Sequence, residues 1–468
     1  MRTSLPRLPA LAALIATPLL LETPAHAIPP PPYAHHVCPN GLEVIVVERH
    51  STPLMTVEIA VHTGAMSEPP EYNGLSHLFE HMFFKGNKAL PDQLAYSARV
   101  RELGMNFNGT TDNDRVNYYF TTTSDHVADA MVFMRDAITS PLFDKKELDR
   151  ERVVVTGEMD RNESQPEFLL WRAVEQAVYW KYPSRKNALG DRKTVLSTTP
   201  EKMRTIQRRY YTPNNSLLVV TGDVHADDVF RRADELYGAW ATAPDPLLKF
   251  PLVQHPPIAR SKVVVVEQPV QTFNANFNWL GPSSIGPSAG YTYAADLLDQ
   301  LVRDRGSKFQ RDLVDSGACV RARFGWPTVR DQGAISASFE ATEANVDRCV
   351  MAIKEEIKNI EAPDYFTDAE MSNAAHVMDV NEARRREETE SYAHLLTSMW
   401  ANADLAYYAT YSDRIHAVTR SDLNAYLDTY VSGKPFVFGV LESPTLAKTI
   451  TKAHLESLVG IAAKTGAK

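Results

Sequence analysis

The sequence is poor in cysteine, has no excess of positive charge and contains a single extended apolar run. Three cysteines in 468 residues are too few for a disulfide framework, and their scattered positions exclude a zinc site built from cysteines. The formal net charge of -9 provides no basic field, so we expect neither nucleic acid nor an anionic membrane surface as the main partner. The composition is otherwise that of a globular protein, and the length predicts about two to four domains.

The apolar run, residues 8–21, follows two arginines and precedes the small-residue sequence "PAHA", which ends at Ala27. This order predicts a cleavable export signal over residues 1–27. A membrane span needs about 20 apolar residues, whereas this run is shorter and holds two prolines. An uncleaved anchor is the alternative. We expect the mature chain to be exported, most simply to a periplasm and otherwise to the outside medium, and to lack a membrane span.

The state of the cysteines is open at this point. In an oxidising compartment, Cys319 and Cys349 either form one disulfide or remain buried thiols, and the state of Cys38 is equally undecided. No chemistry is assigned to any of the three residues.

Two stretches with the same order of features indicate an internal duplication. The β-branched runs in "LEVIVVERHSTPLMTVEIAVHTG", from residue 42, predict paired strands, and "SKVVVVEQPVQTFNANFNWLG", from residue 261, repeats the order. Amphipathic segments such as residues 127–138 and 343–360 predict helices. We therefore predict an α+β fold of two homologous halves, each a mainly antiparallel sheet covered by helices.

The composition also predicts where the halves begin and end. After the export signal, we expect an extended leader at residues 28–40 and a first half at residues 41–240. A proline-rich linker follows at residues 241–260, and a second half at residues 261–468. Within the second half, the charged run "RRREETE", from residue 384, is most simply a solvated helix face.

The stretch "GLSHLFEHMFFKGN", residues 74–87, carries two histidines four residues apart with a glutamate directly before the second. In a helix, His77 and His81 project from one face, so both imidazoles can reach one ion while Glu80 stands beside them. Zinc accepts nitrogen and oxygen ligands in a tetrahedron and leaves one corner open for water. Glu80 would then act as a general base towards that water.

A third ligand is needed, because the pattern H-x-x-E-H also occurs by chance. Glu151 and Glu158 in "DKKELDRERVVVTGEMDRNESQPE" are seven residues apart and therefore lie on one helical face. Either carboxylate can reach an ion held by another helix. The alternative is that both belong to an ordinary solvated helix, and spacing alone leaves the two interpretations equally open.

Together these residues resemble the inverted-motif zinc peptidases, the family of pitrilysin, insulin-degrading enzyme and the mitochondrial processing peptidase. The shared features include the glycine before the first histidine, the Phe-Lys-Gly after the second and "YYTPNNSLLVVTGDV" from residue 210, and the resemblance covers about residues 36–440. It implies that Zn²⁺ is bound by His77, His81 and Glu158. It further implies that Glu80 is the base and that Glu151 orients the ligands.

The resemblance also concerns the architecture and the substrate. It implies two halves that face each other as a clamshell, of which the second lacks the zinc motif. "NFNGTTDNDRVNYYFTT", from residue 106, lies where the family has an edge strand that pairs with an extended peptide. Asn108 matches a family asparagine near the scissile bond, which makes it a substrate-binding residue. The alternative is that Asn108 is a turn residue before Gly109.

One departure from the family concerns groups that hold the substrate carbonyl. Self-sufficient members carry an arginine and a tyrosine in the second half, whereas the matching stretch "DLVDSGACVRARFGW" has Ser316 and Val320 at these positions. The alternative to a missing arginine is that Arg321 or Arg323 serves as a shifted substitute for it. Losing such donors costs about two to three orders of magnitude in rate. We therefore expect a heterodimer in which a related chain without the zinc motif supplies the arginine and the tyrosine.

These inferences predict an exported zinc metalloendopeptidase that hydrolyses peptides or unfolded polypeptide segments. The alternative is a non-catalytic peptide-binding or assembly protein on the same scaffold, with structural zinc. A metal-dependent hydrolase of non-peptide substrates is a third class, and no sequence feature favours it.

Overall fold

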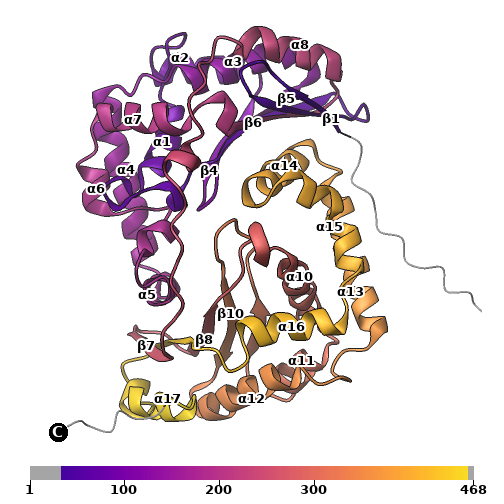
Figure 1. The fold of residues 1–468 in the computed structure, drawn as a ribbon. Helices are drawn as coiled ribbons and strands as arrows, with labels where there is room; N and C mark the ends of the chain where they lie inside the picture. Colours follow the sequence, from indigo (N-terminus) through magenta and orange to yellow (C-terminus); the bar gives the residue numbers. More distant parts are fainter. Residues whose placement is uncertain (1–32, 462–468) are drawn as a thin grey trace, which may run out of the picture.

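The computed structural model describes residues 33–461, which form two mixed sheets with helices on both faces (Figure 1). The predicted export signal lies outside the described residues, as does the first part of the predicted leader. The strands of the first sheet are β1 (Ala34–Val37), β2 (Glu43–Glu48), β3 (Leu54–Val61), β4 (Asn106–Thr111), β5 (Val116–Thr123) and β6 (Ser216–Gly222). Those of the second are β7 (Lys262–Glu267), β8 (Phe273–Leu280), β9 (Arg321–Gly325), β10 (Ala334–Ala341) and β11 (Val437–Glu442).

The two sheets share one topology. Their strand orders are β1-β2-β6-β3-β5-β4 and β7-β11-β8-β10-β9, so the orders correspond once β1 is set aside. In each half the first and last of the corresponding strands pair in parallel, and their other neighbours pair antiparallel. The predicted α+β fold of two homologous halves is confirmed. Residues 34–37 of the predicted leader form β1, which adds a further antiparallel strand beside β2.

Helices occupy most of the remaining chain. In the first half they are α1 (Leu75–Phe83), α2 (Gln93–Glu102), α3 (Val127–Thr139), α4 (Lys145–Glu163), α5 (Pro166–Val178), α6 (Arg192–Leu196), α7 (Pro200–Tyr210) and α8 (Ala226–Tyr237). A short helix, α9 (Pro246–Lys249), lies between the halves. In the second half they are α10 (Gly290–Arg303), α11 (Lys308–Gln310), α12 (Val346–Asn359), α13 (Asp368–Arg385), α14 (Thr389–Asn402), α15 (Leu405–His416), α16 (Arg420–Tyr430) and α17 (Lys452–Leu458).

The core of the first half follows from the alternation of side chains along the strands. In β3, Val57 and Ile59 point to one face and pack against residues of α1 and α3, such as Phe79 and Met134. Glu58 lies between these two residues and points to the opposite face. One face of the first sheet is therefore covered by helices of its own half.

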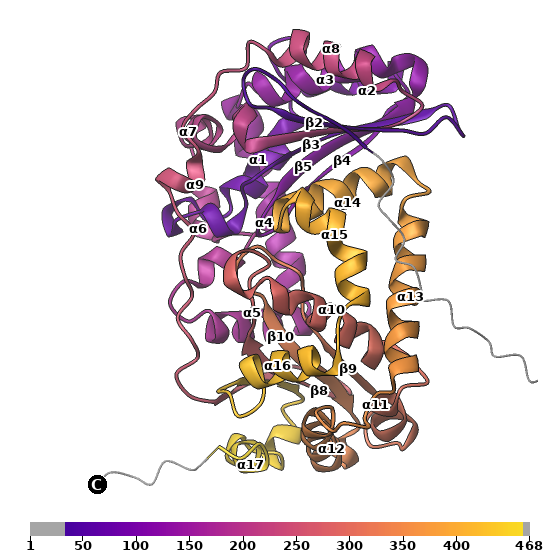
Figure 2. The ribbon, with the colours of Figure 1, turned by 45° about the vertical axis from the view of Figure 1, so that its right-hand side comes forward.

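The opposite face of each sheet is covered by a helix from the other half. Tyr392 and Leu396 of α14 pack against Ile45 and Val219 of the first sheet. Figure 2 shows α14 lying along the underside of this sheet. In return, α5 packs against β11 and β7 of the second sheet. This exchange ties the halves together, and amphipathic periodicity in the sequence does not predict it.

Buried polar groups also fix α14 to the first sheet. The Glu58 carboxylate is fully buried and accepts hydrogen bonds from Asn117 Nδ2 at 2.8 Å and Thr397 Oγ1 at 2.6 Å. His394 of α14 contacts its other oxygen. Because a buried carboxylate is costly without partners, these bonds from both halves restrict the position of α14.

The charged run from residue 384 differs from its prediction. It spans the end of α13, a turn and the start of α14, and Arg386 is buried and paired with Glu382 at 3.0 Å. The prediction of one helix face is therefore wrong, and so is its exposure at Arg386, whereas Arg384, Arg385, Glu387 and Glu388 are exposed as predicted. The physical reason is that the chain must turn here so that α14 can reach the first sheet.

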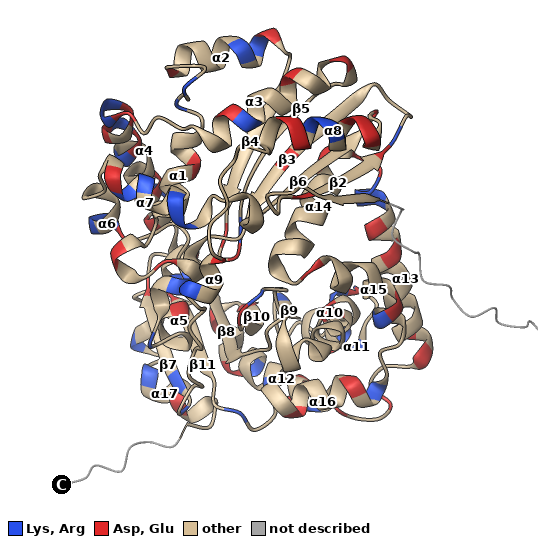
Figure 3. Ribbon diagram, turned by 45° about the horizontal axis from the view of Figure 1, so that its top comes forward, with Lys and Arg blue, Asp and Glu red and all other residues tan. Residues whose placement is uncertain are grey.

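The distribution of surface charge, the composition of the helices and the state of the cysteines complete the description of the fold. In Figure 3, Lys and Arg are interspersed with Asp and Glu over both halves. None of the helices among residues 33–461 combines the length and apolar composition needed to cross a membrane. Cys319 and Cys349 form a disulfide with a Cα–Cα distance of 5.0 Å, which joins the start of β9 to α12, and Cys38 is a buried thiol.

Truncation of α14 tests the exchange of helices. Leu396 is fully buried between α14 and the first sheet, so Leu396→Ala is expected to lower the free energy of unfolding by about 2–5 kcal/mol. Urea denaturation measures the change. Leu248→Ala is the matched control, because Leu248 is 83% exposed, and we expect a change within about 0.5 kcal/mol. Equal stability of the two variants would contradict the packing of α14.

Candidate active site

The predicted motif lies on α1, whose start is fixed by a buried glutamate. Gly74 precedes the helix with φ of 93°, and a side chain there would approach Gly190 Cα to 2.7 Å. Glu68 Oε2 accepts a hydrogen bond from Gly74 N at 2.7 Å, and its Oε1 accepts one from Ser76 N at 2.5 Å. Glu68 thereby caps the free amides at the helix start, a role that the N-cap glycine cannot take.

Three predicted ligand atoms meet where α1 packs against α4. The His77 Nε2 to His81 Nε2 distance is 3.3 Å, and Glu158 Oε2 of α4 lies 3.5 Å from the first nitrogen and 3.6 Å from the second. Zinc bonds to nitrogen and oxygen of about 2.0–2.1 Å give tetrahedral edges of about 3.3 Å. The three residues therefore fit a zinc ion with an open fourth position.

Glu151 lies behind His81 rather than in the triangle of ligand atoms. Its Oε2 is 3.0 Å from His81 Nδ1, and its Oε1 is 2.8 Å from Lys85 Nζ. Burial raises the pKa of Glu151, but the hydrogen bonds from His81 and Lys85 outweigh it and lower the pKa overall. An ionised Glu151 accepts the Nδ1 proton, which leaves the lone pair of His81 Nε2 directed at the triangle.

The protonation of His77 suits a metal ligand. Burial, followed by the proximity of His81, lowers the pKa of His77 to about 4. The imidazole is therefore neutral near pH 7, as metal binding requires. His81 differs: burial lowers its pKa, yet the bond to Glu151 and the nearby carboxylates raise it overall.

Glu80 stands beside the triangle and is held by β4. Thr111 Oγ1 donates a hydrogen bond to Glu80 Oε2 at 2.8 Å. Burial raises the pKa of Glu80, and this bond opposes the rise. Gly109, also in β4, makes room for the side chain, because a Cβ atom there would lie 2.8 Å from Glu80 Cγ. β4 therefore both approaches and orients the predicted base.

Asn108 lies within β4, which forms an edge of the first sheet. It pairs in register with Tyr119 of β5, and its Oδ1 accepts a hydrogen bond from the adjacent Gly109 N at 2.9 Å. The alternative that Asn108 is a turn residue is therefore wrong. The outer edge of β4 has no neighbouring strand among the described residues, so its backbone can pair with an extended peptide.

Comparison with known proteins identifies the family. Residues 43–192 match the model described as Insulinase (Peptidase family M16), and residues 197–378 match the Peptidase M16 inactive domain. The chain belongs to peptidase family M16. Its relatives in this family include human insulin-degrading enzyme, with 29% identity over 46% of this chain and 22% of that protein.

Two other M16 relatives are smaller. An uncharacterized zinc protease of Bacillus subtilis, YmxG, is 26% identical over 44% of this chain and 50% of its own length. A probable mitochondrial-processing peptidase subunit beta of Arabidopsis thaliana is 24% identical over 57% of this chain and 51% of its own length. The chain thus spans between about a fifth and about half of the curated relatives it matches.

Solved structures share the two-domain M16 fold. A protease from Helicobacter pylori superposes with a TM-score of 0.79 and 20% identity, covering 88% of this chain and 100% of that chain. The periplasmic protease PqqL from Escherichia coli superposes with a TM-score of 0.74 and 17% identity, covering 95% of this chain and 52% of that chain. The fold of this M16 chain is therefore shared along most of its length.

The second half of this M16 chain offers few donors at the matching positions. Ser316 Oγ donates to the backbone oxygen of Asp312 at 2.7 Å, and Val320 is exposed without a side-chain donor. Arg321 Nε donates to Glu340 Oε2 at 2.7 Å. Arg321 and Arg323 line a cavity of about 470 Å³ between β9 and β10 of the second half and α5 of the first half. The partner of Arg321 among the described residues is thus Glu340 and not one of the three predicted zinc ligands.

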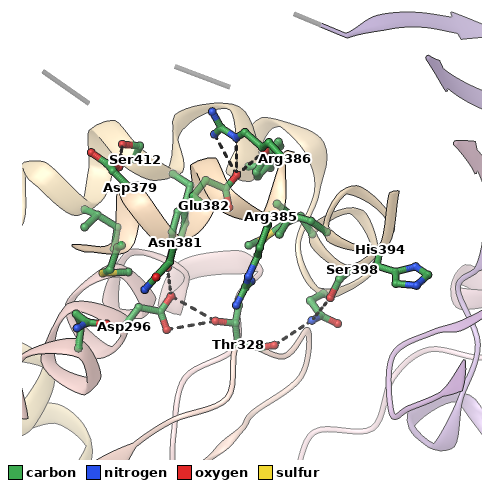
Figure 4. Close-up of a pocket in the computed structure, with 18 of the residues that line it drawn as sticks. Asp296, Thr328, Asp379, Asn381, Glu382, Arg385, Arg386, His394, Ser398 and Ser412 are labelled. Atoms are coloured by element: carbon green, nitrogen blue, oxygen red, sulfur yellow. Dashed lines mark hydrogen bonds and ion pairs between the residues drawn. The ribbon is translucent and has the colours of Figure 1, made fainter. Parts of the chain in front are cut away.

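A cavity of about 650 Å³ lies apart from the triangle, between α10, α13, α14 and α15 (Figure 4). Asp296 accepts hydrogen bonds from Tyr411 at 2.7 Å and Thr328 at 3.3 Å, and burial raises its pKa to about 7. Glu382 is paired with Arg386. The acidic side chains of Asp296 and Glu382 thus have partners within the wall of this cavity.

Some residues of the M16 site were not predicted from the sequence. Lys85 lies four residues after His81, in the turn that follows α1, and this spacing is compatible with a shared partner for the two side chains. Thr111 and Glu68 act on α1 from other segments, and no local pattern marks them. The structure brings His77, His81 and Glu158 together with Glu80 beside them. Arg321 and Arg323 line the cavity beside α5 instead.

Removing the charge behind His81 tests the geometry of the site. Glu151→Gln keeps the side-chain shape but removes the negative charge that orients His81, so zinc affinity is expected to fall about tenfold to a hundredfold. Competition with a zinc chelator measures the affinity. Glu163→Gln is the matched control, because Glu163 also lies on α4 but pairs with Arg172 at 2.5 Å. Equal zinc affinity in the two variants would contradict the role of Glu151.

Proposed function

We propose that the chain is the zinc-bearing subunit of an exported metalloendopeptidase that cleaves peptides or unfolded polypeptide segments. The observation that carries this proposal is the triangle of His77, His81 and Glu158 with Glu80 beside it. A structural zinc site needs four ligands and no base, whereas this site has three ligands, an open position and an orientated carboxylate.

His77, His81 and Glu158 would hold Zn²⁺, which when bound supplies a Lewis acid that polarises the peptide carbonyl and lowers the pKa of water. Glu80 accepts a proton from the attacking water and delivers it to the leaving amine. Its raised pKa, caused mainly by burial, suits both steps. Thr111 holds one oxygen of Glu80, so the other is free to face the substrate.

The edge of β4 supports a peptide as the substrate. An extended chain can add to this edge through main-chain hydrogen bonds, and it would then run past Glu80. The exposed Asn108 on β4 would contact the peptide near the scissile bond. Because a folded segment cannot pair with a strand edge, unfolded segments are the expected substrates.

The missing donors support a heterodimer. Ser316 and Val320 cannot replace an arginine and a tyrosine, and Arg321 is already engaged by Glu340. A related chain without the zinc motif would supply both groups to the substrate carbonyl. The same absence favours the second candidate, a peptide-binding or assembly protein with zinc but without turnover. Export rests on the sequence of residues 1–27, with the periplasmic relative as support.

Hydrolysis of a quenched fluorescent peptide library by the purified mature chain tests the proposal. Alone, the chain is expected to contain zinc and to show slow, chelator-sensitive turnover. A related chain that carries the arginine and the tyrosine is expected to raise the rate about a hundredfold or more. Glu80→Gln should keep the zinc and reduce this rate to background.

Each part of the proposal has its own contradicting result. Undiminished turnover by Glu80→Gln would exclude Glu80 as the base. Full activity of the isolated chain that disappears in Arg321→Ala or Arg323→Ala would exclude the need for a partner. A zinc-loaded chain that binds extended peptides but never cleaves them, even with the related chain present, would favour the binding protein.

A further inference from the structure

We propose a second divalent metal site at the rim of the first sheet, distinct from the triangle on α1 and α4. Its ligands are Glu48, His50 and His225, and Asp223 orients one of the imidazoles. One donor atom from each of the three ligands lies within 4.8 Å of the others. The mixed set of imidazole and carboxylate donors selects a borderline divalent cation such as Zn²⁺, and Ni²⁺ or Cu²⁺ would share this chemistry.

The parallel pairing of β2 and β6 creates the site. Glu48 is the last residue of β2 and pairs in register with Gly222, the last residue of β6. Because parallel strands end on the same side of a sheet, the residues that follow both strands meet there. His50 follows β2, Asp223 follows β6, and His225 directly precedes α8.

The distances between donor atoms fit an ion after small side-chain movements. His50 Nε2 lies 3.4 Å and His225 Nδ1 lies 3.9 Å from the same oxygen, Glu48 Oε2. The corresponding distances in the triangle on α1 and α4 are 3.3–3.6 Å. The ring centroids of His50 and His225 are 5.3 Å apart. The three side chains are exposed, so they can close around an ion without repacking a core.

Hydrogen bonds behind the ligands orient them. His50 Nδ1 lies 2.7 Å from Asp223 Oδ1, which directs the other ring nitrogen at Glu48. Asp223 is in turn held by Ser124 Oγ at 2.9 Å, and Glu48 Oε1 accepts the Ala226 N–H at 2.7 Å. The pair of His50 and Asp223 repeats the arrangement of His81 and Glu151, in which a carboxylate fixes the tautomer of a metal-binding histidine.

A simple ion-pair cluster is the competing explanation. Hydrogen bonds to Asp223 and Glu48 raise the pKa of His50, so a proton on this imidazole could balance the two carboxylates without a metal. A cation would displace that proton and satisfy the same carboxylates. The two explanations differ in whether the protein binds an additional metal ion, which can be measured.

The cluster of His376, Asp379 and His416 has a similar composition, but its carboxylate oxygens are less available to a metal ion. Asp379 lies between His376 and His416, but its oxygens already accept hydrogen bonds from Ser412 Oγ at 2.6 Å and His416 Nε2 at 2.7 Å. In contrast, the His50 Nε2 to Glu48 contact is long at 3.4 Å, which leaves both atoms available. The rim of the first sheet is therefore the stronger site.

Zinc stoichiometry of the full chain, dialysed against buffered free Zn²⁺ and read by atomic emission, tests the proposal. We expect two zinc ions per chain in the wild type, one in His77→Ala/His81→Ala and one in His50→Ala/His225→Ala. His454→Ala is the matched control, since His454 is exposed and pairs with a single carboxylate of Asp347 at 2.8 Å, and it should keep both ions. Circular dichroism confirms that each variant is folded.

The two sites are read independently in this experiment. Loss of one ion from His50→Ala/His225→Ala, but not from His454→Ala, supports the rim site even if the triangle on α1 and α4 binds nothing. Wild-type stoichiometry in His50→Ala/His225→Ala overturns it, whatever the result for His77→Ala/His81→Ala. A separate measurement, thermal melting of His77→Ala/His81→Ala with and without added Zn²⁺, should show that Zn²⁺ raises the Tm and that adding His50→Ala abolishes the rise. An unchanged Tm also overturns the rim site.

Discussion

The contact between α1 and α4, fixed by the buried carboxylate of Glu151, is the interaction on which the proposed site depends. Glu151 is 5% exposed and binds both His81 and Lys85. A buried carboxylate is unfavourable unless it is paired, so the two helices can approach only where these bonds form. Two turns further along α4, this placement brings Glu158 to the imidazoles of α1.

The exchange of helices between the halves also supports β4, whose free edge is the proposed binding place of the peptide substrate. α14 covers the first sheet from the second half, and Glu390 at its start accepts a hydrogen bond from Thr121 Oγ1 of β5 at 3.0 Å. β5 is the neighbour of β4, which carries Thr111 and the free edge. The second half thus supports, through β5, the strand that orients Glu80. Arg321 and Arg323 of the second half line the cavity beside α5 instead.

The sequence predicted what depends on local spacing and missed what depends on distant segments. His77, Glu80 and His81 follow from their spacing in one helix, whereas the choice of Glu158 over Glu151 came from a family resemblance. The duplicated strand patterns predicted two similar halves, but amphipathic periodicity does not say which sheet a helix will cover. Thr111 therefore could not be predicted, and neither could the rim site, because its residues meet only through the pairing of β2 with β6.

The measurement that tests the central claim most directly is anomalous diffraction at the zinc edge from crystals of the zinc-loaded chain. The account predicts a zinc peak between α1 and α4, bonded to His77 Nε2, His81 Nε2 and Glu158, with Glu151 bonded to His81 Nδ1 and not to the metal. A peak bonded to Glu151 in place of Glu158, or no peak between these helices, would contradict it.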